Sequence, residues 1–190
     1  MEYLCGVDEV GRGPWFGPVV AAAVILPENH SLVGLNDSKK LSEKKRIALA
    51  EQIKLIAIDY SIAEASAEEI DQINILRATH LAMQRAVKTL SPVPDHVLID
   101  GNSIPKLPMS AEAIIQGDGK IAAISAASII AKVYRDQLMV EFAELYPNYG
   151  LSQHKGYGTK NHREALERFG ITPLHRKSFQ PIRQLITDLE

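Results

Sequence analysis

Carboxylates stand at the ends of three short apolar segments of the sequence. Asp8 and Glu9 follow YLCGV, Asp100 ends HVLID, and Asp118 follows AEAIIQG, each close to a glycine. Because the carboxyl ends of parallel strands lie side by side at one edge of a sheet, these four acids could meet there. Carboxylates that meet repel one another unless a cation lies between them, and Mg²⁺ accepts oxygen ligands of this kind. The pattern therefore predicts a metal site, in which two ions ~3.5–4 Å apart could hydrolyse a phosphodiester.

Each aspartate taken alone has a simpler interpretation, because Asp beside Gly is common in the turn that follows a strand. We favour the metal site because all of the acids share the pattern. Asp8 and Glu9 raise one difficulty for it. Neighbouring residues of a regular strand point to opposite faces, so both can serve one site only if the chain bends there or Glu9 reaches around the strand.

Arg12 stands between Gly11 and Gly13, directly after the first two acids. The glycines would let backbone amides approach a ligand closely, and the guanidinium would offer a fork to phosphate or ribose oxygens. A tight turn would explain the glycines but not the arginine. The stretch is not a dinucleotide-binding fingerprint, because its glycine spacing differs and a strand-like segment follows it.

Basic residues gather in three places, although the net charge of the chain is −2. Residues 1–149 carry 14 basic and 19 acidic side chains, whereas residues 150–190 carry 7 and 4. The clusters are DSKKLSEKKR (37–46), HKGYGTKNHR (154–163) and HRKSFQPIR (175–183). Each cluster alone is typical of a solvated face. The second also places Tyr157 between two glycines, where its ring could stack on a sugar or base, and we predict that it contacts nucleic acid.

The elements that must position these residues alternate between strand and helix, which predicts an α/β or α+β domain with a helical C-terminal extension. Strands are predicted over residues 3–7, 16–26, 57–65, 95–100 and 111–118. Ser42 is the predicted N-cap of one helix, and a capping box predicts a continuous helix over residues 66–90. A long helix is predicted from about 121 to 146, and a capping box at Asn161 predicts a shorter one in the tail.

Several classes of protein are excluded by the composition and the N-terminal sequence. Cys5 is the only cysteine, so no intramolecular disulfide or multi-cysteine metal site can form. No histidine spacing matches a zinc motif. The first residues resemble no targeting peptide, and the longest apolar run, residues 19–26, is far shorter than a bilayer span. With 190 residues and 46% hydrophobic content, we expect one domain, monomeric and cytoplasmic, without contact to a membrane.

Motifs along nearly the whole chain resemble those of bacterial ribonuclease HII, a type 2 ribonuclease H. In order, they are GVDEVGRGPWFGPVVAAAVIL, LNDSKKLS, LIDGN, GDGKIAAISAASIIAKVYRD, HKGYGT and HRKSF. The resemblance implies a single ribonuclease H-like catalytic domain over residues 1–190. Its core would be a mixed β-sheet flanked by helices over about residues 1–146, and its C-terminal helical region, about 147–190, would bind substrate.

The activity implied by the resemblance is that of an endoribonuclease dependent on Mg²⁺ or Mn²⁺. Such an enzyme cleaves the RNA strand of RNA/DNA hybrids. It also incises on the 5′ side of single ribonucleotides embedded in duplex DNA, leaving 3′-hydroxyl and 5′-phosphate ends. The implied roles are the removal of ribonucleotides from DNA and the removal of RNA primers.

The resemblance also implies which acids bind the metal and catalyse, namely Asp8, Glu9, Asp100 and Asp118. Asp136 matches a family acid too, and in some members it is considered the fourth catalytic residue in place of the equivalent of Asp118. We favour Asp118, because its predicted position at a strand end matches that of Asp100. Asp136 could instead pair with Lys132, one helical turn earlier.

Six further residues correspond to the substrate contacts of the family, namely Gly11, Arg12, Gly13, Ser38, Lys39 and Tyr157. The glycine-flanked arginine resembles the motif that recognises the 2′-hydroxyl, largely through backbone contacts. Tyr157 resembles the tyrosine that stacks on the following deoxyribose, where an additional 2′-hydroxyl would clash. Ser38 and Lys39 correspond to residues that hold backbone phosphates.

The chain departs from the family pattern at Val10, Trp15 and Phe16, where smaller or aliphatic residues are more usual. These departures leave the metal ligands intact, but the resemblance does not predict how the loop packs around them. Two other functions remain open from the residues alone. One is a metal-dependent phosphodiesterase with another nucleic-acid substrate. The other is a non-catalytic module that binds hybrid duplex, which leaves the acids unexplained because carboxylates near phosphates weaken binding without metal.

Overall fold

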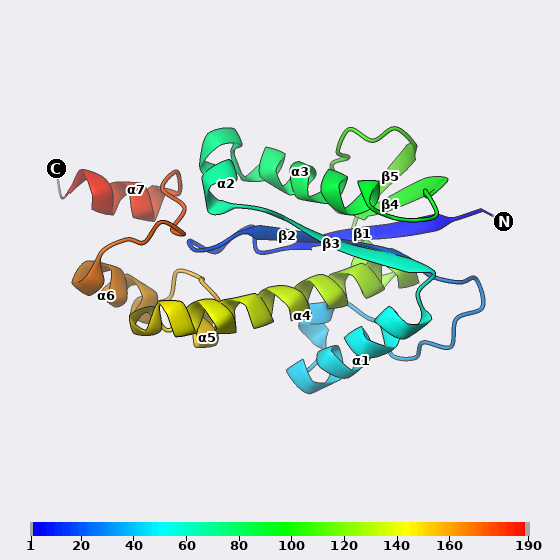
Figure 1. Cartoon of the computed structure of the whole chain (residues 1–190), viewed down its shortest axis with the longest axis horizontal. Helices are drawn as coiled ribbons and strands as arrows, with labels where there is room; N and C mark the ends of the chain where they lie inside the picture. The colour runs from blue at the N-terminus through cyan, green and yellow to red at the C-terminus, as the bar shows by residue number, and fades with distance from the viewer. Residues whose placement is uncertain (1, 189–190) are drawn as a thin grey trace.

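Five strands form one mixed sheet in the computed structural model, which describes residues 2–188 (Figure 1). The strands are β1 (Leu4–Val10), β2 (Val19–Ile25), β3 (Asp59–Ala65), β4 (His96–Asp100) and β5 (Ser110–Ile114), in the order β3-β2-β1-β4-β5. β2 runs antiparallel to both β1 and β3, whereas β1, β4 and β5 are parallel. The carboxyl ends of β1 and β4 therefore lie side by side at one edge of the sheet.

Helices cover both faces of the sheet, as Figure 1 shows. α2 (Ala67–Ile73) and α3 (Ile75–Lys88) lie on one face, and α1 (Glu43–Ile56) and α4 (Ala122–Leu145) on the other. β2 is buried along its whole length because alternate side chains enter the two cores. This explains why its sequence is an uninterrupted apolar run and not an alternation of apolar and polar residues. The α/β sheet flanked by helices, as expected from the sequence, is confirmed.

α4 packs directly on β1, where Gly6 allows the two backbones to touch. A Cβ atom at Gly6 would lie 2.1 Å from the carbonyl carbon of Ala123, so no larger residue fits. This close approach places the first half of α4 beneath the end of β1. The side chains of Ser128 and Lys132 consequently reach the edge of the sheet where β1 and β4 end.

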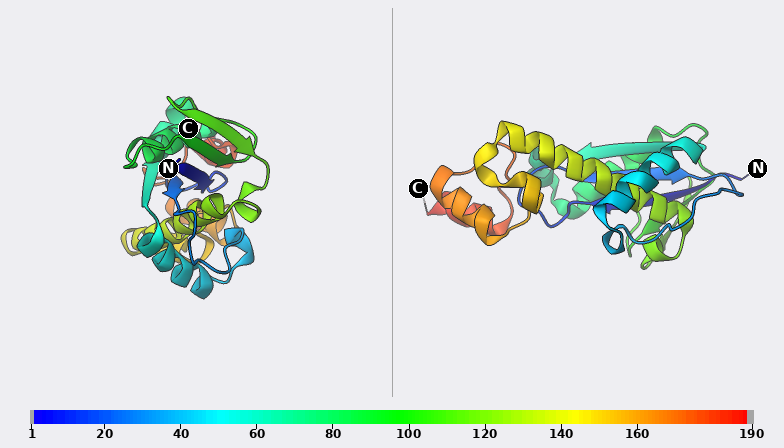
Figure 2. Two further views of the ribbon diagram at one scale, coloured as in Figure 1. Left: turned by 90° about the vertical axis from the view of Figure 1, so that its right-hand side faces the viewer. Right: turned by 90° about the horizontal axis from the view of Figure 1, so that it is seen from below.

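The C-terminal region forms a third apolar core beyond the end of the sheet (Figures 1 and 2). Its elements are a 3₁₀ turn η3 (Pro147–Tyr149), α5 (Leu151–His154), α6 (Lys160–Phe169) and α7 (Gln180–Thr187). Phe16, from the loop between β1 and β2, is fully buried in this core together with Met139 of α4. The molecule is elongated because these helices extend the sheet along its length and do not cover it.

The helix caps at Ser42 and at Ser66 with Glu69 are confirmed, as is the long helix that ends before Pro147. The first strand runs on to Val10 and the second begins only at Val19, and three further boundaries differ from the prediction. The helix predicted over 66–90 is divided at Asn74, whose φ of 71° interrupts it and whose side chain caps α3. The tail helix begins after Thr159, which accepts from the backbone N–H of His162. Asn161 is therefore not its N-cap.

The predicted strand over 111–118 is the last of these differences, and it affects the site. β5 ends at Ile114, after which Gln116 adopts a left-handed conformation with a φ of 56°. The chain then forms a 3₁₀ turn, η2 (Gly117–Gly119), so that Asp118 lies on this turn and not at the end of a strand.

Candidate active site

Asp8, Asp100 and Asp118 converge at the edge of the sheet where β1 and β4 end. One carboxylate oxygen of each lies within 4.8 Å of those of the other two. Asp8 and Asp100 are close because β1 and β4 are hydrogen-bonded neighbours. Asp118 is brought to them by its turn, since Asp100 Oδ1 accepts hydrogen bonds from the backbone N–H groups of Gly117 (2.7 Å) and Asp118 (3.3 Å).

The carboxylates of this cluster disfavour one another's charge. Asp8 is only 5% exposed, and its burial, followed by the charges of Glu9 and Asp100, raises its pKa well above the usual value. Burial also raises the pKa of Asp118, as do Asp100 and Asp37, although Lys39 opposes the effect. A cation bound among these groups would relieve the repulsion and favour their ionised forms.

Glu9 does not belong to this group of three. β1 is regular through Val10, so Glu9 lies on the α3 side of the strand whereas Asp8 lies on the α4 side. Its Oε1 is 3.7 Å from a guanidinium nitrogen of Arg12, and its backbone N–H donates to Asp8 Oδ1 at 2.7 Å. Burial raises the pKa of Glu9 although Arg12 lowers it. Asp8 and Glu9 thus lie on opposite faces of the strand, which is the difficulty predicted from the sequence. Glu9 nevertheless reaches the rim of the same cavity.

A cavity of about 400 Å³ opens above the acids. It is lined by all ten site residues predicted from the sequence, namely Asp8, Glu9, Gly11, Arg12, Gly13, Ser38, Lys39, Asp100, Asp118 and Tyr157. Ser128 and Lys132 also line it, although neither was predicted to belong to the site. Their spacing of four residues places both on one face of α4, which was the available signal. The hydroxyl of Ser128 lies 3.0 Å from that of Ser38 and favours the ionised form of Asp8.

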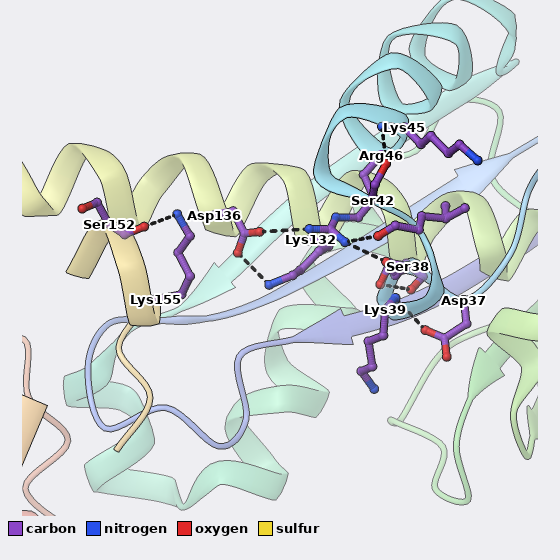
Figure 3. Close-up of polar contacts among 12 residues, drawn as sticks. Asp37, Ser38, Lys39, Ser42, Lys45, Arg46, Lys132, Asp136, Ser152 and Lys155 are labelled. Atoms are coloured by element: carbon purple, nitrogen blue, oxygen red, sulfur yellow. Dashed lines mark hydrogen bonds and ion pairs between the residues drawn. The ribbon is translucent and has the colours of Figure 1, made fainter. Parts of the chain in front are cut away.

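Ser38 and Lys39 reach the cavity from a short 3₁₀ turn, η1 (Ser38–Lys40), which Figure 3 shows in detail. The side chain of Asp37 accepts from the backbone N–H of Lys39 at 2.9 Å. Arg46 of α1 donates to the carbonyl oxygens of Ser38 and Leu41, at 3.0 and 2.6 Å. The turn is thus fixed from both sides, which leaves the Lys39 side chain extended beside the acids.

Asp136 lies outside the acid cluster. It pairs with Lys132, whose Nζ is 2.7 Å from Oδ1, and with Arg46, whose guanidinium nitrogen is 3.9 Å from Oδ2 (Figure 3). It lines a different cavity, between α1 and α4. The geometry therefore favours Asp118 over Asp136 as the fourth acid of the site. The reason given from the sequence, a position of Asp118 at the end of a strand, was wrong.

Tyr157 lies beside Gly13, and both residues line the cavity. Its side chain is 43% exposed, and a Cβ atom at Gly13 would lie 3.4 Å from its ring. The loop of residues 11–18 is tied to the C-terminal region by backbone hydrogen bonds, among them the one from Trp15 N–H to the carbonyl of Gly156 at 2.8 Å. The indole of Trp15 packs on Gly158, where a Cβ atom would lie 2.2 Å from the ring. This contact explains how the chain accommodates its unusual tryptophan.

Comparison with known proteins gives concordant results. The family model for ribonuclease HII matches residues 5–182. A ribonuclease HII of Vibrio vulnificus (strain YJ016) is 57% identical over 183 residues, which are 96% of this chain and 88% of the relative. The crystal structure of the ribonuclease H2 from Pyrococcus horikoshii OT3 has a TM-score of 0.82 and 26% identity, with 98% of each chain covered. The structure of Bst-RNase HIII in complex with Mn²⁺ has a TM-score of 0.78, covering 100% of this chain and 70% of that one; at 19% identity it shows the fold alone.

The fold is that of a nuclease of the ribonuclease H type, and the acid cluster offers three carboxylates that could hold a metal ion. The chain belongs to the ribonuclease HII family. It is accordingly a ribonuclease H, a hydrolase that acts on RNA in RNA/DNA hybrids. Among the helices within residues 2–188, none combines the length and the apolar character that crossing a bilayer requires.

Proposed function

We propose that the chain is a two-metal-ion endoribonuclease that cleaves the RNA strand of RNA/DNA hybrids and also incises on the 5′ side of single ribonucleotides in duplex DNA. The products would carry 3′-hydroxyl and 5′-phosphate ends. The observation that carries the proposal is the convergence of Asp8, Asp100 and Asp118 within 4.8 Å, in a cavity that basic and aromatic residues also line. An activity of this kind would serve to remove ribonucleotides and RNA primers from DNA. We expect the enzyme to be a cytoplasmic monomer.

The acid cluster fits Mg²⁺ or Mn²⁺. All of its ligands are hard carboxylate oxygens, which these ions prefer. The raised pKa values of Asp8 and Asp118 mark a cluster in which positive charge is insufficient. We assign Asp8, Asp100 and Asp118 as ligands and catalytic residues, with Glu9 as the fourth from the rim. When bound, two such ions would supply an activated water and stabilise the leaving oxygen.

The residues around the acids would select and orient the substrate. We assign the backbone of Gly11, Arg12 and Gly13 to the 2′-hydroxyl of the ribose, because these residues line the cavity beside Glu9. Tyr157 would stack on the next deoxyribose. This arrangement would favour the junction at which a ribonucleotide is followed by DNA. The buried hydroxyl of Ser38 and the exposed Lys39, which both line the cavity, would hold backbone phosphates.

The experiment that tests the proposal uses a labelled DNA duplex with one internal ribonucleotide, an RNA/DNA hybrid and an all-DNA duplex of the same sequence. Each is incubated with the protein in Mg²⁺, Mn²⁺ or EDTA. We expect metal-dependent cleavage of the duplex with one ribonucleotide and of the RNA/DNA hybrid, but not of the all-DNA duplex. The duplex with one ribonucleotide should be cut just 5′ of the ribose. Asp8→Asn is the matched inactive control, since it preserves shape and removes one charge. Equal cleavage of the all-DNA duplex would instead indicate a general phosphodiesterase, and metal-independent cleavage would remove the acids from the mechanism.

A further inference from the structure

Two arginines lie buried beneath the loop of residues 11–18. Arg135 of α4 is 1% exposed and Arg176 is 0% exposed. The ion pairs found within residues 2–188 include neither of them. Burial lowers the pKa of Arg135 to about 10 and that of Arg176 to about 9. A buried cation is costly unless its donors are satisfied, so the bonds that these two side chains make indicate what they stabilise.

Arg176 binds the backbone of the loop that carries the glycine-flanked arginine. It donates to the carbonyl oxygens of Gly11 (2.6 Å), Arg12 (2.9 Å) and Gly17 (2.9 Å). In a trans peptide the C=O and the following N–H point in opposite directions. Because the carbonyls of Gly11 and Arg12 point toward Arg176, the N–H groups of Arg12 and Gly13 point away from it. Neither N–H has a protein acceptor in the part of the chain that the structure describes, and both residues line the cavity.

Arg135 connects the same loop to the segment that carries Tyr157. It donates to the carbonyl oxygens of Phe16 (2.9 Å), Pro18 (3.1 Å) and Lys155 (2.8 Å). Lys155 precedes Tyr157 by two residues, so one guanidinium fixes the spacing between the two walls of the cavity. Gly11 lies against this side chain with a φ of 88°, and a Cβ atom there would lie 2.1 Å from Arg135 Nε.

We propose that Arg135 and Arg176 are positioning residues that together present two backbone N–H groups, those of Arg12 and Gly13, and the ring of Tyr157 to a single ribose. Neither arginine touches the substrate. The inference rests on the proposed function, since it explains how the chain holds the groups assigned to ribose recognition. It assigns a role in specificity to Arg176, which belongs to a basic cluster typical of a solvated face, and to Arg135, for which the sequence predicted no role.

Arginine suits this role because its planar fork carries donors in several fixed directions, whereas a lysine offers its donors from one point. Arg135→Lys and Arg176→Lys therefore keep the positive charge but cannot reach three separate carbonyls. We expect the loop to lose its fixed orientation in these variants while the charge near the substrate is unchanged. The same substitution at Arg168, which is exposed on α6, is the matched control.

The first measurement is the affinity ratio between a duplex with one ribonucleotide and the all-DNA duplex, in Mg²⁺. All proteins carry Asp8→Asn so that the duplex stays intact. We expect the parent and Arg168→Lys to bind the duplex with one ribonucleotide more tightly than the all-DNA duplex. In Arg135→Lys and Arg176→Lys the affinity ratio should fall roughly tenfold, while both variants still bind DNA. Near-ultraviolet circular dichroism and thermal unfolding confirm that each variant is folded. A merely structural role would weaken both affinities together and leave the ratio unchanged.

The second measurement needs no variant at either arginine. In the Asp8→Asn protein, amide hydrogen exchange of Arg12 and Gly13 is compared with and without each duplex. We expect fast exchange in the free protein and protection by the ribonucleotide duplex only. A folded Arg176→Lys protein that retains the full preference, or amides already protected in the free protein, would overturn the positioning role alone. A parent protein that shows no preference for the ribonucleotide would overturn the proposed function together with it.

Discussion

The side chain of Asp100 fixes Asp118 through the main chain. Asp100 Oδ1 accepts from the backbone N–H of Asp118 at 3.3 Å and from that of Gly117 at 2.7 Å, so one acid of the cluster holds the turn that carries another. The arrangement brings carboxylates together without a covalent or metal constraint. Because these groups repel one another, the geometry that suits a cation reduces the stability of the metal-free protein.

Asp8→Asn is expected to raise the free energy of unfolding at pH 7 by about 0.5–2 kcal/mol in EDTA. Asparagine retains an oxygen that can accept from the Glu9 N–H, but it removes a charge that burial and two neighbouring acids disfavour. Urea denaturation measures the change. Asp95→Asn is the control, since Asp95 is exposed and also accepts from a backbone N–H.

Added Mg²⁺ should then raise the unfolding midpoint of the wild-type protein more than that of Asp8→Asn, because a ligand stabilises only the state that binds it. A variant less stable than the wild type in EDTA would show that Asp8 is not under electrostatic strain. It would also weaken the assignment of Asp8 as a metal ligand.

Asp118→Asn and Asp136→Asn are expected to have different effects. Asp118→Asn should lower kcat roughly a hundredfold or more, because it removes a proposed metal ligand. Asp136→Asn should keep kcat within about tenfold and lose about 1.5–3 kcal/mol of stability, because it breaks the ion pairs with Lys132 and Arg46. Steady-state kinetics and urea denaturation of both variants test this. The opposite ranking in kcat would assign the fourth catalytic position to Asp136.

The sequence was most informative where chemistry and local backbone rules coincide. Acids at the ends of parallel strands had to lie near one another, and the caps at Ser42 and Ser66 reflect local hydrogen bonding that the residue types determine. The position of Asp118 was less predictable, because the left-handed Gln116 redirects the chain after β5 and only glycine or asparagine would have signalled such a bend. The division of the helix at Asn74 also comes from a residue with a positive φ, but there the asparagine was an available signal.

The two buried arginines could not have been predicted from the pattern. Arg176 belongs to a basic cluster that favours a solvated face, yet it is fully buried. Its acceptors are main-chain carbonyls more than 150 residues earlier in the chain, and a carbonyl leaves no signature in a sequence. The same holds for Arg135, which stands beside Asp136 in KVYRD but donates to the loop and the C-terminal region instead.

Tyr157→Ala is expected to reduce kcat/KM on a duplex with one ribonucleotide by the equivalent of about 1–3 kcal/mol, the usual contribution of an aromatic stack. Tyr157→Phe is the matched control, because it keeps the ring and removes only the hydroxyl. The exposed side chain should contribute little to stability, so both variants should unfold near the wild-type midpoint. Equal activity of the alanine variant would exclude Tyr157 from substrate recognition.

Gly158→Ala is expected to destabilise the protein by about 1–3 kcal/mol, because the new Cβ atom would overlap the indole of Trp15. The backbone of Gly158 is not left-handed, so the effect should come from space alone. Adding Trp15→Leu should recover most of the loss, and a double-mutant cycle in urea measures the coupling. Independent, additive effects of the two substitutions would contradict this contact.

Acid sensitivity should arise from a pair of buried histidines in the C-terminal region. His162 Nε2 lies 3.0 Å from His175 Nε2. His175 Nδ1 accepts from the backbone N–H of Thr172, and His162 Nδ1 donates to the carbonyl of Tyr157. These bonds require both rings to be neutral. Burial is the main cause that lowers the pKa of His162 to about 4 and that of His175 to about 3.

Since an unfolded histidine binds its proton near pH 6.5, the unfolded chain takes up protons that His162 and His175 refuse in the folded state. Their contribution to stability is therefore complete above about pH 6.5, and it falls as the pH decreases toward the folded-state pKa values of about 4 and 3. Urea denaturation between pH 7 and 5 should show this decline in the wild-type protein. His175→Gln can supply one acceptor and one donor without titrating, so it should reduce the slope of the free energy of unfolding against pH. Because both proteins contain the same acids, the difference between their slopes cancels the contribution of the acids. An unchanged slope would mean that the pair is not what makes the fold sensitive to acid.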